Sequence, residues 1–178
     1  VILYLHNCVE LVVGIFAVLK ADGVFVVINA TTKIDKLLYT ARNSRATAIL
    51  LPATQFDTAT TILEGTESVK FVVLTGKPGQ QPCTDGPYRY FDQIQADYPD
   101  SRPICRSIDQ DLACLIYTSG STGDPKGVMS GHNNVVFAAS SIITYLENRQ
   151  DDIVVNGLPL SFDYGLYQLL MVFKFGGT

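Results

Sequence analysis

Residues 117–127, YTSGSTGDPKG, bring together the residue types that a bound polyphosphate requires. Serine and threonine hydroxyls donate hydrogen bonds, and glycines leave backbone N–H groups open to a close-fitting anion. Lys126 supplies a counter-charge, and Pro125 stiffens the chain just before it. Because the apolar run 112–116 comes directly before this stretch, we expect a loop that begins where a buried strand ends.

Two familiar nucleotide-binding patterns do not fit this loop. A Walker A motif has a second glycine before its lysine and Ser or Thr after it, whereas Pro125 and Gly127 flank Lys126 here. No GxGxxG spacing occurs between Ser119 and Gly127 either. The alternative is an ordinary turn between two strands, which is the commoner role of a short Gly/Ser segment.

The overall composition is that of a globular, mildly acidic protein. The 178 residues are 47% hydrophobic and only 17% charged, which is enough apolar material for one domain-sized core. The net charge of −4, the pI near 5.0 and the lack of a Lys/Arg block argue against a general nucleic-acid binder.

Cysteine and histidine usage predicts no metal site. The four cysteines show no CxxC spacing, and neither histidine lies near a cysteine pair. Cys8 and Cys114 lie in apolar stretches, where a reduced, buried thiol is the usual state, so we expect a cytoplasmic protein. No leader-like segment is expected, and the apolar run 11–19 is too short to span a bilayer.

Strand-like and helix-like segments alternate along the chain, which predicts an α/β fold with a largely parallel sheet between helical layers. The Gly- and Pro-rich segment 76–87 is expected to be a surface loop within one domain. The expected strands are 1–5, 24–28, 46–51, 69–75, 111–118 and 152–160. The expected helices are 8–20, 33–44, 56–63, 90–99, 135–146 and 164–175, with Asn133 or Asn134 as N-cap of the fifth.

The loop YTSGSTGDPKG resembles the signature loop of the AMP-forming adenylating superfamily, which includes acyl-CoA synthetases, luciferases and peptide-synthetase adenylation domains. The flanks DLACLIY and VMSGHNNVV are also similar to that family, as are residues 12–51 and the block LPLSFDYGLYQLL at 158–170. The resemblance thus covers nearly the whole chain. It implies that the sheet is part of the family's large N-terminal domain.

The resemblance implies a two-step ligase reaction. A carboxylic acid reacts with ATP and Mg²⁺ to give an acyl-adenylate and pyrophosphate, and the acyl group then passes to coenzyme A or to a carrier protein's phosphopantetheine. Lys126 is implied as the catalytic counter-charge. The residues implied to hold the phosphates are Thr118, Ser119, Gly120, Ser121, Thr122, Gly123 and Lys126.

Substrate class depends on the segment Phe162, Asp163, Tyr164 and Gly165, which the resemblance places at the acyl pocket. Many acyl-CoA synthetases carry a histidine where Phe162 stands, and a Phe-Asp pair is similar to amino-acid-activating domains. Asp163 is therefore either a partner for a substrate amino group or an N-cap of the following helix. An acyl-CoA ligase is the preferred interpretation, and an amino-acid-activating domain is the alternative.

The family's later motifs have no counterpart in the 178 residues. We therefore expect residues 1–178 to be a partial N-terminal AMP-binding domain, cut at both ends and inactive alone. A binding protein that kept the fold but lost turnover is a further alternative, and the intact loop with Lys126 weighs against it.

Overall fold

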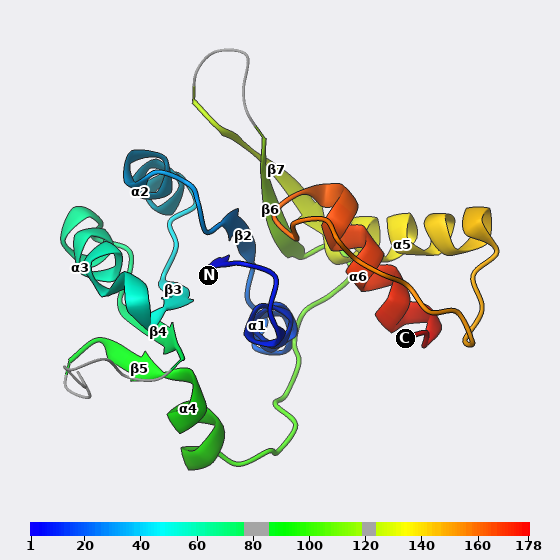
Figure 1. The fold of residues 1–178 in the computed structure, drawn as a ribbon, viewed down its shortest axis with the longest axis horizontal. Helices are drawn as coiled ribbons and strands as arrows, with labels where there is room; N and C mark the ends of the chain where they lie inside the picture. Colours follow the sequence, from blue (N-terminus) through cyan, green and yellow to red (C-terminus); the bar gives the residue numbers. More distant parts are fainter. Residues whose placement is uncertain (77–85, 119–123) are drawn as a thin grey trace.

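The computed structural model describes residues 1–76, 86–118 and 124–178. Its first part is a regular strand–helix alternation, as expected from the sequence (Figure 1). Runs of apolar residues form the strands because both faces of a central parallel sheet are covered. The elements are β1 (Ile2–Leu5), α1 (Val9–Lys20), β2 (Val26–Asn29), α2 (Ile34–Asn43), β3 (Ala48–Pro52), α3 (Phe56–Gly65), β4 (Phe71–Thr75), β5 (Tyr88–Tyr90) and α4 (Phe91–Asp97).

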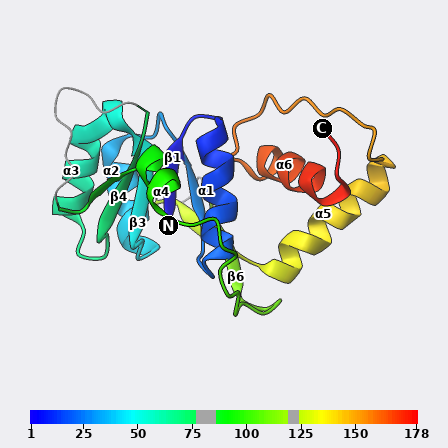
Figure 2. The ribbon, with the colours of Figure 1, turned by 90° about the horizontal axis from the view of Figure 1, so that it is seen from below.

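The five strands form one parallel sheet in the order β2-β1-β3-β4-β5. Alternate residues of β1 enter different cores: Ile2 packs in the cluster that includes α2 and α3, and Leu3 packs in the cluster that includes α1. Figure 2 shows α2 and α3 on one face of the sheet and α1 on the other. The predicted α/β fold, with a parallel sheet between helices, is confirmed.

A second, smaller sheet carries the predicted phosphate loop. β6 (Leu112–Thr118) pairs in antiparallel fashion with β7 (Lys126–Gly131), so the loop closes a hairpin. Phe25 bridges Cys114 in parallel, with Phe25 N–H donating to Ala113 O at 3.1 Å, which joins β6 to the edge of the main sheet beside β2. The strand β7 was not predicted, because a short run with two glycines lacks the apolar pattern of a strand.

The last part of the chain holds α5 (His132–Leu146) and α6 (Asp163–Phe175), which lie against each other. The prediction of a strand over 152–160 is wrong: this segment has no regular secondary structure. Its apolar residues Ile153 and Val155 are 79% and 88% exposed, and within the described ranges the segment has no strand to pair with.

Three of the four cysteines fall in the described part of the chain, where Cys8, Cys105 and Cys114 are free thiols. Burial raises the pKa of the Cys114 thiol to about 11, with a smaller opposing effect of a hydrogen bond with Ser130. None of the helices that the structure describes has both the length and the apolar character needed to cross a bilayer.

Candidate active site

The β6–β7 hairpin places Thr118 and Lys126 opposite each other at the base of the loop. Asp124 and Pro125 come just before Lys126, and the Asp124 side chain is exposed. The remaining predicted phosphate ligands lie outside the described residues; they are Ser119, Gly120, Ser121, Thr122 and Gly123. The described base of the hairpin thus carries one hydroxyl and one cation from the predicted set.

One contact of Tyr117 ties the hairpin to α2, and a second packs its two strands against each other. Its hydroxyl donates to Asn43 Oδ1, at the end of α2, over 2.5 Å. Its ring covers Gly127 so closely that a Cβ at that position would lie 3.0 Å from the ring. Burial raises the pKa of Tyr117, with Tyr39 adding to the shift, so the phenol stays a proton donor. These contacts hold the strands on both sides of the loop.

A cavity of about 180 Å³ joins the loop base to the carboxyl end of β2. Ligands of open α/β sheets bind in such crevices outside the carboxyl ends of the strands. Its lining includes several hydroxyls, the Asn29 amide and the cation Lys36, and this combination suits a phosphorylated ligand. The lining residues are Val27, Ile28, Asn29, Thr32, Lys36, Thr40, Tyr117, Thr118, Pro125, Ser161 and Phe162.

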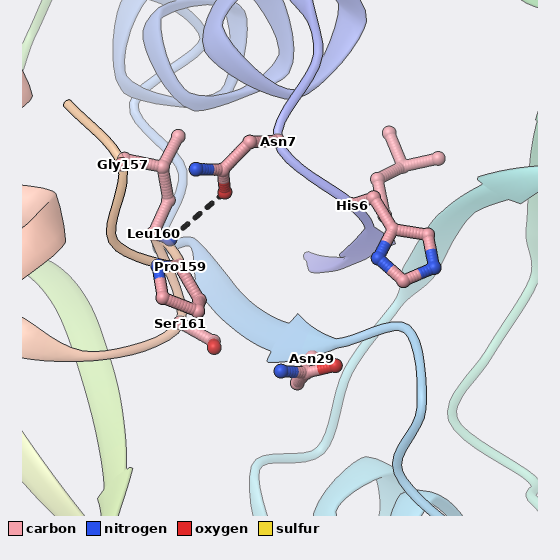
Figure 3. Close-up of a pocket in the computed structure, with 8 residues that line it drawn as sticks. His6, Asn7, Asn29, Gly157, Pro159, Leu160 and Ser161 are labelled. Carbon is pink, nitrogen blue, oxygen red and sulfur yellow. Dashed lines mark hydrogen bonds between the residues drawn. The ribbon is translucent and has the colours of Figure 1, made fainter. Parts of the chain in front are cut away.

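A neighbouring cavity of about 310 Å³ lies where β1 and β2 end (Figure 3). His6 and Asn7 follow β1, Asn29 ends β2, and Gly157 and Ser161 complete the wall from the irregular segment before α6. The Ser161 hydroxyl is buried and has no hydrogen-bond partner in the described part of the chain. The sequence alone gave no role to His6, Asn7, Asn29 or Lys36. All but Lys36 lie at or just after the end of a predicted parallel strand, and that position was the signal that could have identified them.

The segment predicted to contact the substrate, residues 162–165, lies at the start of α6. Phe162, not Asp163, occupies the N-cap position, so the N-cap alternative for Asp163 is off by one residue, and its substrate alternative stays a prediction. Asp163 Oδ1 accepts a hydrogen bond from the Tyr164 N–H at 2.7 Å, and all three side chains are exposed. Gly165 is buried beneath a backbone turn, where a Cβ would lie 2.5 Å from Pro159 O.

Tyr164 also borders an apolar cavity of about 400 Å³ between α5 and α6. Burial raises the pKa of Tyr167 in its wall, and Cys114 and Asp163 add to the shift, so this phenol is neutral. The Gln168 side-chain oxygen is buried with no hydrogen-bond partner in the described chain. The cavity is lined by Ser141, Ile142, Tyr145, Leu146, Tyr164, Tyr167, Gln168 and Met171.

His132 lies at the first position of α5, where its backbone N–H donates to Asp111 O at 3.0 Å. Gly131 is the N-cap, so neither Asn133 nor Asn134 holds the position predicted for them, although Asn134 Oδ1 accepts the Gly131 N–H at 3.1 Å. Within residues 1–76, 86–118 and 124–178, no three His, Cys, Asp or Glu side chains gather as metal ligands.

Comparisons with known proteins show which family the chain resembles. A family model described as "AMP-binding enzyme" matches residues 1–178. The chain is 32% identical over 174 residues to the phosphinothricin tripeptide synthetase PhsC of Streptomyces viridochromogenes, covering 98% of the chain and 14% of that synthetase. It is also 29% identical over 163 residues to the crotonobetaine/carnitine–CoA ligase of Salmonella paratyphi A, covering 89% of the chain and 31% of the ligase.

The fold is similar to that of the anthranilate CoA ligase AuaEII, solved in complex with anthranoyl-AMP. The TM-score is 0.89 at 23% sequence identity, over 99% of the chain and 34% of the ligase. At this identity the likeness concerns the fold alone. The chain therefore spans about a third or less of the length of each of these three proteins.

Proposed function

The chain belongs to the AMP-binding enzyme family, and we propose that the protein activates a carboxylic acid and transfers it to a thiol. The observation that carries this proposal is the hairpin that sets Thr118 opposite Lys126, beside a cavity that reaches Phe162. One acid oxygen forms a bond to the α-phosphorus of ATP as the bond to pyrophosphate breaks. The thiol sulfur then attacks the acyl carbon, and AMP leaves.

The residues of the loop bind and orient the phosphates rather than react with them. In this proposal Lys126 neutralises the charge of the departing pyrophosphate. The residues proposed to bind the β- and γ-phosphates are Thr118, Ser119, Gly120, Ser121, Thr122 and Gly123. Lys36 and Thr32 in the adjoining cavity fit the same anion. Mg²⁺ would come bound to the nucleotide and would supply further positive charge at the phosphates, because this ion is held mainly by phosphate oxygens and water and needs few protein ligands.

The acid is an acyl substrate activated for coenzyme A in our preferred form of the proposal. Aromatic and aliphatic side chains predominate in the cavity between α5 and α6, which suits an apolar acid. The alternative is an amino acid activated for the phosphopantetheine of a carrier protein, with Asp163 pairing with the ammonium group. The tripeptide synthetase relative favours this alternative, whereas the carnitine–CoA ligase relative favours the first.

Residues 1–178 are, in this proposal, a partial N-terminal AMP-binding domain of a longer enzyme. The relatives support it, since the crotonobetaine/carnitine–CoA ligase is about three times as long as the stretch it shares with the chain. The same proposal places the enzyme in the cytoplasm, where the free thiols of Cys8, Cys105 and Cys114 would persist. A non-catalytic protein with the same fold remains the competing alternative.

The experiment is acid-dependent exchange of labelled pyrophosphate into ATP by the full-length protein, with matched α-amino acids and simple acids. Exchange with simple apolar acids, retained in Asp163→Asn, supports the acyl ligase. Exchange with amino acids that collapses in Asp163→Asn supports the amino-acid-activating alternative. No exchange with any acid would support the non-catalytic protein.

A further inference from the structure

We propose that Asn7 is a positioning residue for the adenylation step: its side-chain amide fixes residues 158–160 and thereby the location of Phe162 relative to Thr118. The predicted effect of Asn7 on the adenylation rate rests on the proposed function. Its predicted effect on the position of residues 158–160 rests on the structure alone. Asn7 itself need not touch the substrate.

The segment that Asn7 holds lacks secondary structure, so its backbone polar groups need partners from elsewhere. It begins after α5 and ends at Phe162, where α6 starts. Asn156 satisfies one of these groups, since its Oδ1 accepts the Leu158 N–H at 3.2 Å, and its Nδ2 donates to Gly165 O of α6 at 2.9 Å. These bonds are local, so they do not tie the segment to the sheet.

Asn7 supplies the tie to the sheet through two hydrogen bonds. Its Nδ2 donates to Leu158 O at 2.8 Å, and its Oδ1 accepts the Leu160 N–H at 3.0 Å. Asn7 lies two residues after β1, whose last residue Leu5 is 5% exposed, so the amide extends from the end of a buried strand. The bond to Leu160 is partly buried and the bond to Leu158 is exposed, which makes the acceptor oxygen the more important atom.

Leu160 is also held by apolar contacts, since it is 4% exposed in the core cluster that includes α1. Apolar contact is not directional, so it anchors the segment without setting its rotation. The adjacent donor and acceptor of the Asn7 amide do set the rotation of the segment, because they bond its backbone as a neighbouring strand would. Aspartate and serine each lack part of this geometry, because only a side-chain amide offers N–H and C=O side by side.

The segment leads directly to the candidate site. Ser161 and Phe162, the next residues, line the 180 Å³ cavity together with Thr118 and Pro125 from the phosphate loop. A shift of residues 158–160 therefore changes the distance between the acid and the nucleotide. Rates of such reactions are steep in this distance, and a displacement of about 1 Å can cost about 100-fold.

The kinetic test compares Asn7→Ala, Asn7→Asp and the control Glu10→Gln in the full-length protein, using acid-dependent pyrophosphate exchange. Asn7→Ala should lower kcat about 10- to 100-fold with the KM for ATP nearly unchanged. Asn7→Asp keeps the acceptor oxygen and should lie between Asn7→Ala and the wild type. Glu10→Gln, in the first turn of α1, should behave as the wild type.

The structural test is hydrogen–deuterium exchange of the same variants, which needs no activity. Asn7→Ala should exchange faster over residues 158–164 than the wild type, with β1 and α1 unchanged. Unchanged exchange in this segment, or a kcat equal to that of the wild type, would overturn the positioning role. A wild type that lacks all acid-dependent turnover would refute the proposed function, and the exchange comparison would still decide where Asn7 acts.

Discussion

Residues 1–97, the sheet region, and residues 112–178, the hairpin–helix region, differ in how completely they bury their apolar side chains. Two core clusters fill both faces of the sheet region, and residues such as Ile2, Ile49 and Leu51 are fully buried. Many large apolar side chains of the hairpin–helix region are exposed, and few of them are fully buried. They include Val128, Met129, Val136, Phe137, Tyr145, Leu146, Ile153, Val155, Phe162, Tyr164 and Phe173.

This difference in burial matches a difference in role between the two regions. The sheet region supplies a rigid edge, on which His6, Asn7 and Asn29 stand where strands end. The hairpin–helix region carries the predicted phosphate and substrate residues, and a few buried side chains fasten it to the α1 face of the sheet. Those side chains are Cys114, Leu160, Leu166 and Leu170.

The largest expected effect is the stability loss from a core truncation in the sheet region. Leu51→Ala in the 178-residue chain should cost about 2–5 kcal/mol of unfolding free energy, because Leu51 is fully buried and a cavity would remain. Phe137→Ala, at a side chain that is 74% exposed, should change it by less than about 0.5 kcal/mol. Urea denaturation measures both, and equal losses would break the comparison of the two regions.

A smaller effect is expected from the contact that joins the regions at the hairpin. Tyr117→Phe removes the hydroxyl that donates to Asn43 and should cost about 1 kcal/mol. The matched control Tyr145→Phe removes a hydroxyl from a side chain that is 86% exposed and should be neutral. Urea denaturation of both variants gives the comparison; equal values for the two would mean that the Asn43 bond does not secure the hairpin.

The smallest and most local effect concerns Asp22. Its carboxylate binds residues 105–107 of the crossing segment, which is the stretch 98–111 between the two regions. A hydrogen bond from the Ser107 hydroxyl, then bonds from the Arg106 N–H and the Cys105 thiol, lower the pKa of Asp22 from 3.8 to about 2. A lowered pKa means that the carboxylate form stabilises the fold. Its contribution is therefore complete above pH 3.8 and is lost as the pH falls toward about 2.

We expect hydrogen–deuterium exchange over 105–107 to accelerate within that pH window once the intrinsic pH dependence of exchange is subtracted. Asp22→Asn should show at neutral pH the faster exchange that the wild type reaches only in acid. Protection that does not depend on pH or on this substitution would show that other contacts hold the crossing segment.

Most elements of the sheet region could be predicted because continuous apolar runs mark buried strands and Gly or Pro mark their ends. The strand β5 was not predicted, because it directly follows the predicted loop 76–87 and its three residues are too few to show a pattern. The error at 152–160 has the opposite cause. Its apolar residues are typical of a strand, but a strand also needs a neighbour, and that is a property of tertiary structure.

The predicted phosphate residues stand in one stretch of sequence. Their types and spacing, together with the family resemblance, were sufficient to predict a phosphate loop, and that role stays a prediction. The other site residues are far apart in the sequence: the sheet brings His6, Asn7 and Asn29 to one cavity, and Asn29 and Lys36 to the neighbouring cavity at the loop base. Asn7 and Leu160 are 153 residues apart in the sequence, and no local pattern shows such a pairing.

The most direct test of the phosphate-binding role is pyrophosphate exchange by the full-length protein carrying Lys126→Ala. Lys126 is exposed at the hairpin base, so its removal should leave the melting temperature unchanged. Exchange should fall about 100- to 1,000-fold, because a cation that stabilises developing phosphate charge is lost. Lys70→Ala, just before β4 at the opposite end of the sheet, should retain full exchange. Wild-type exchange in Lys126→Ala would contradict the account.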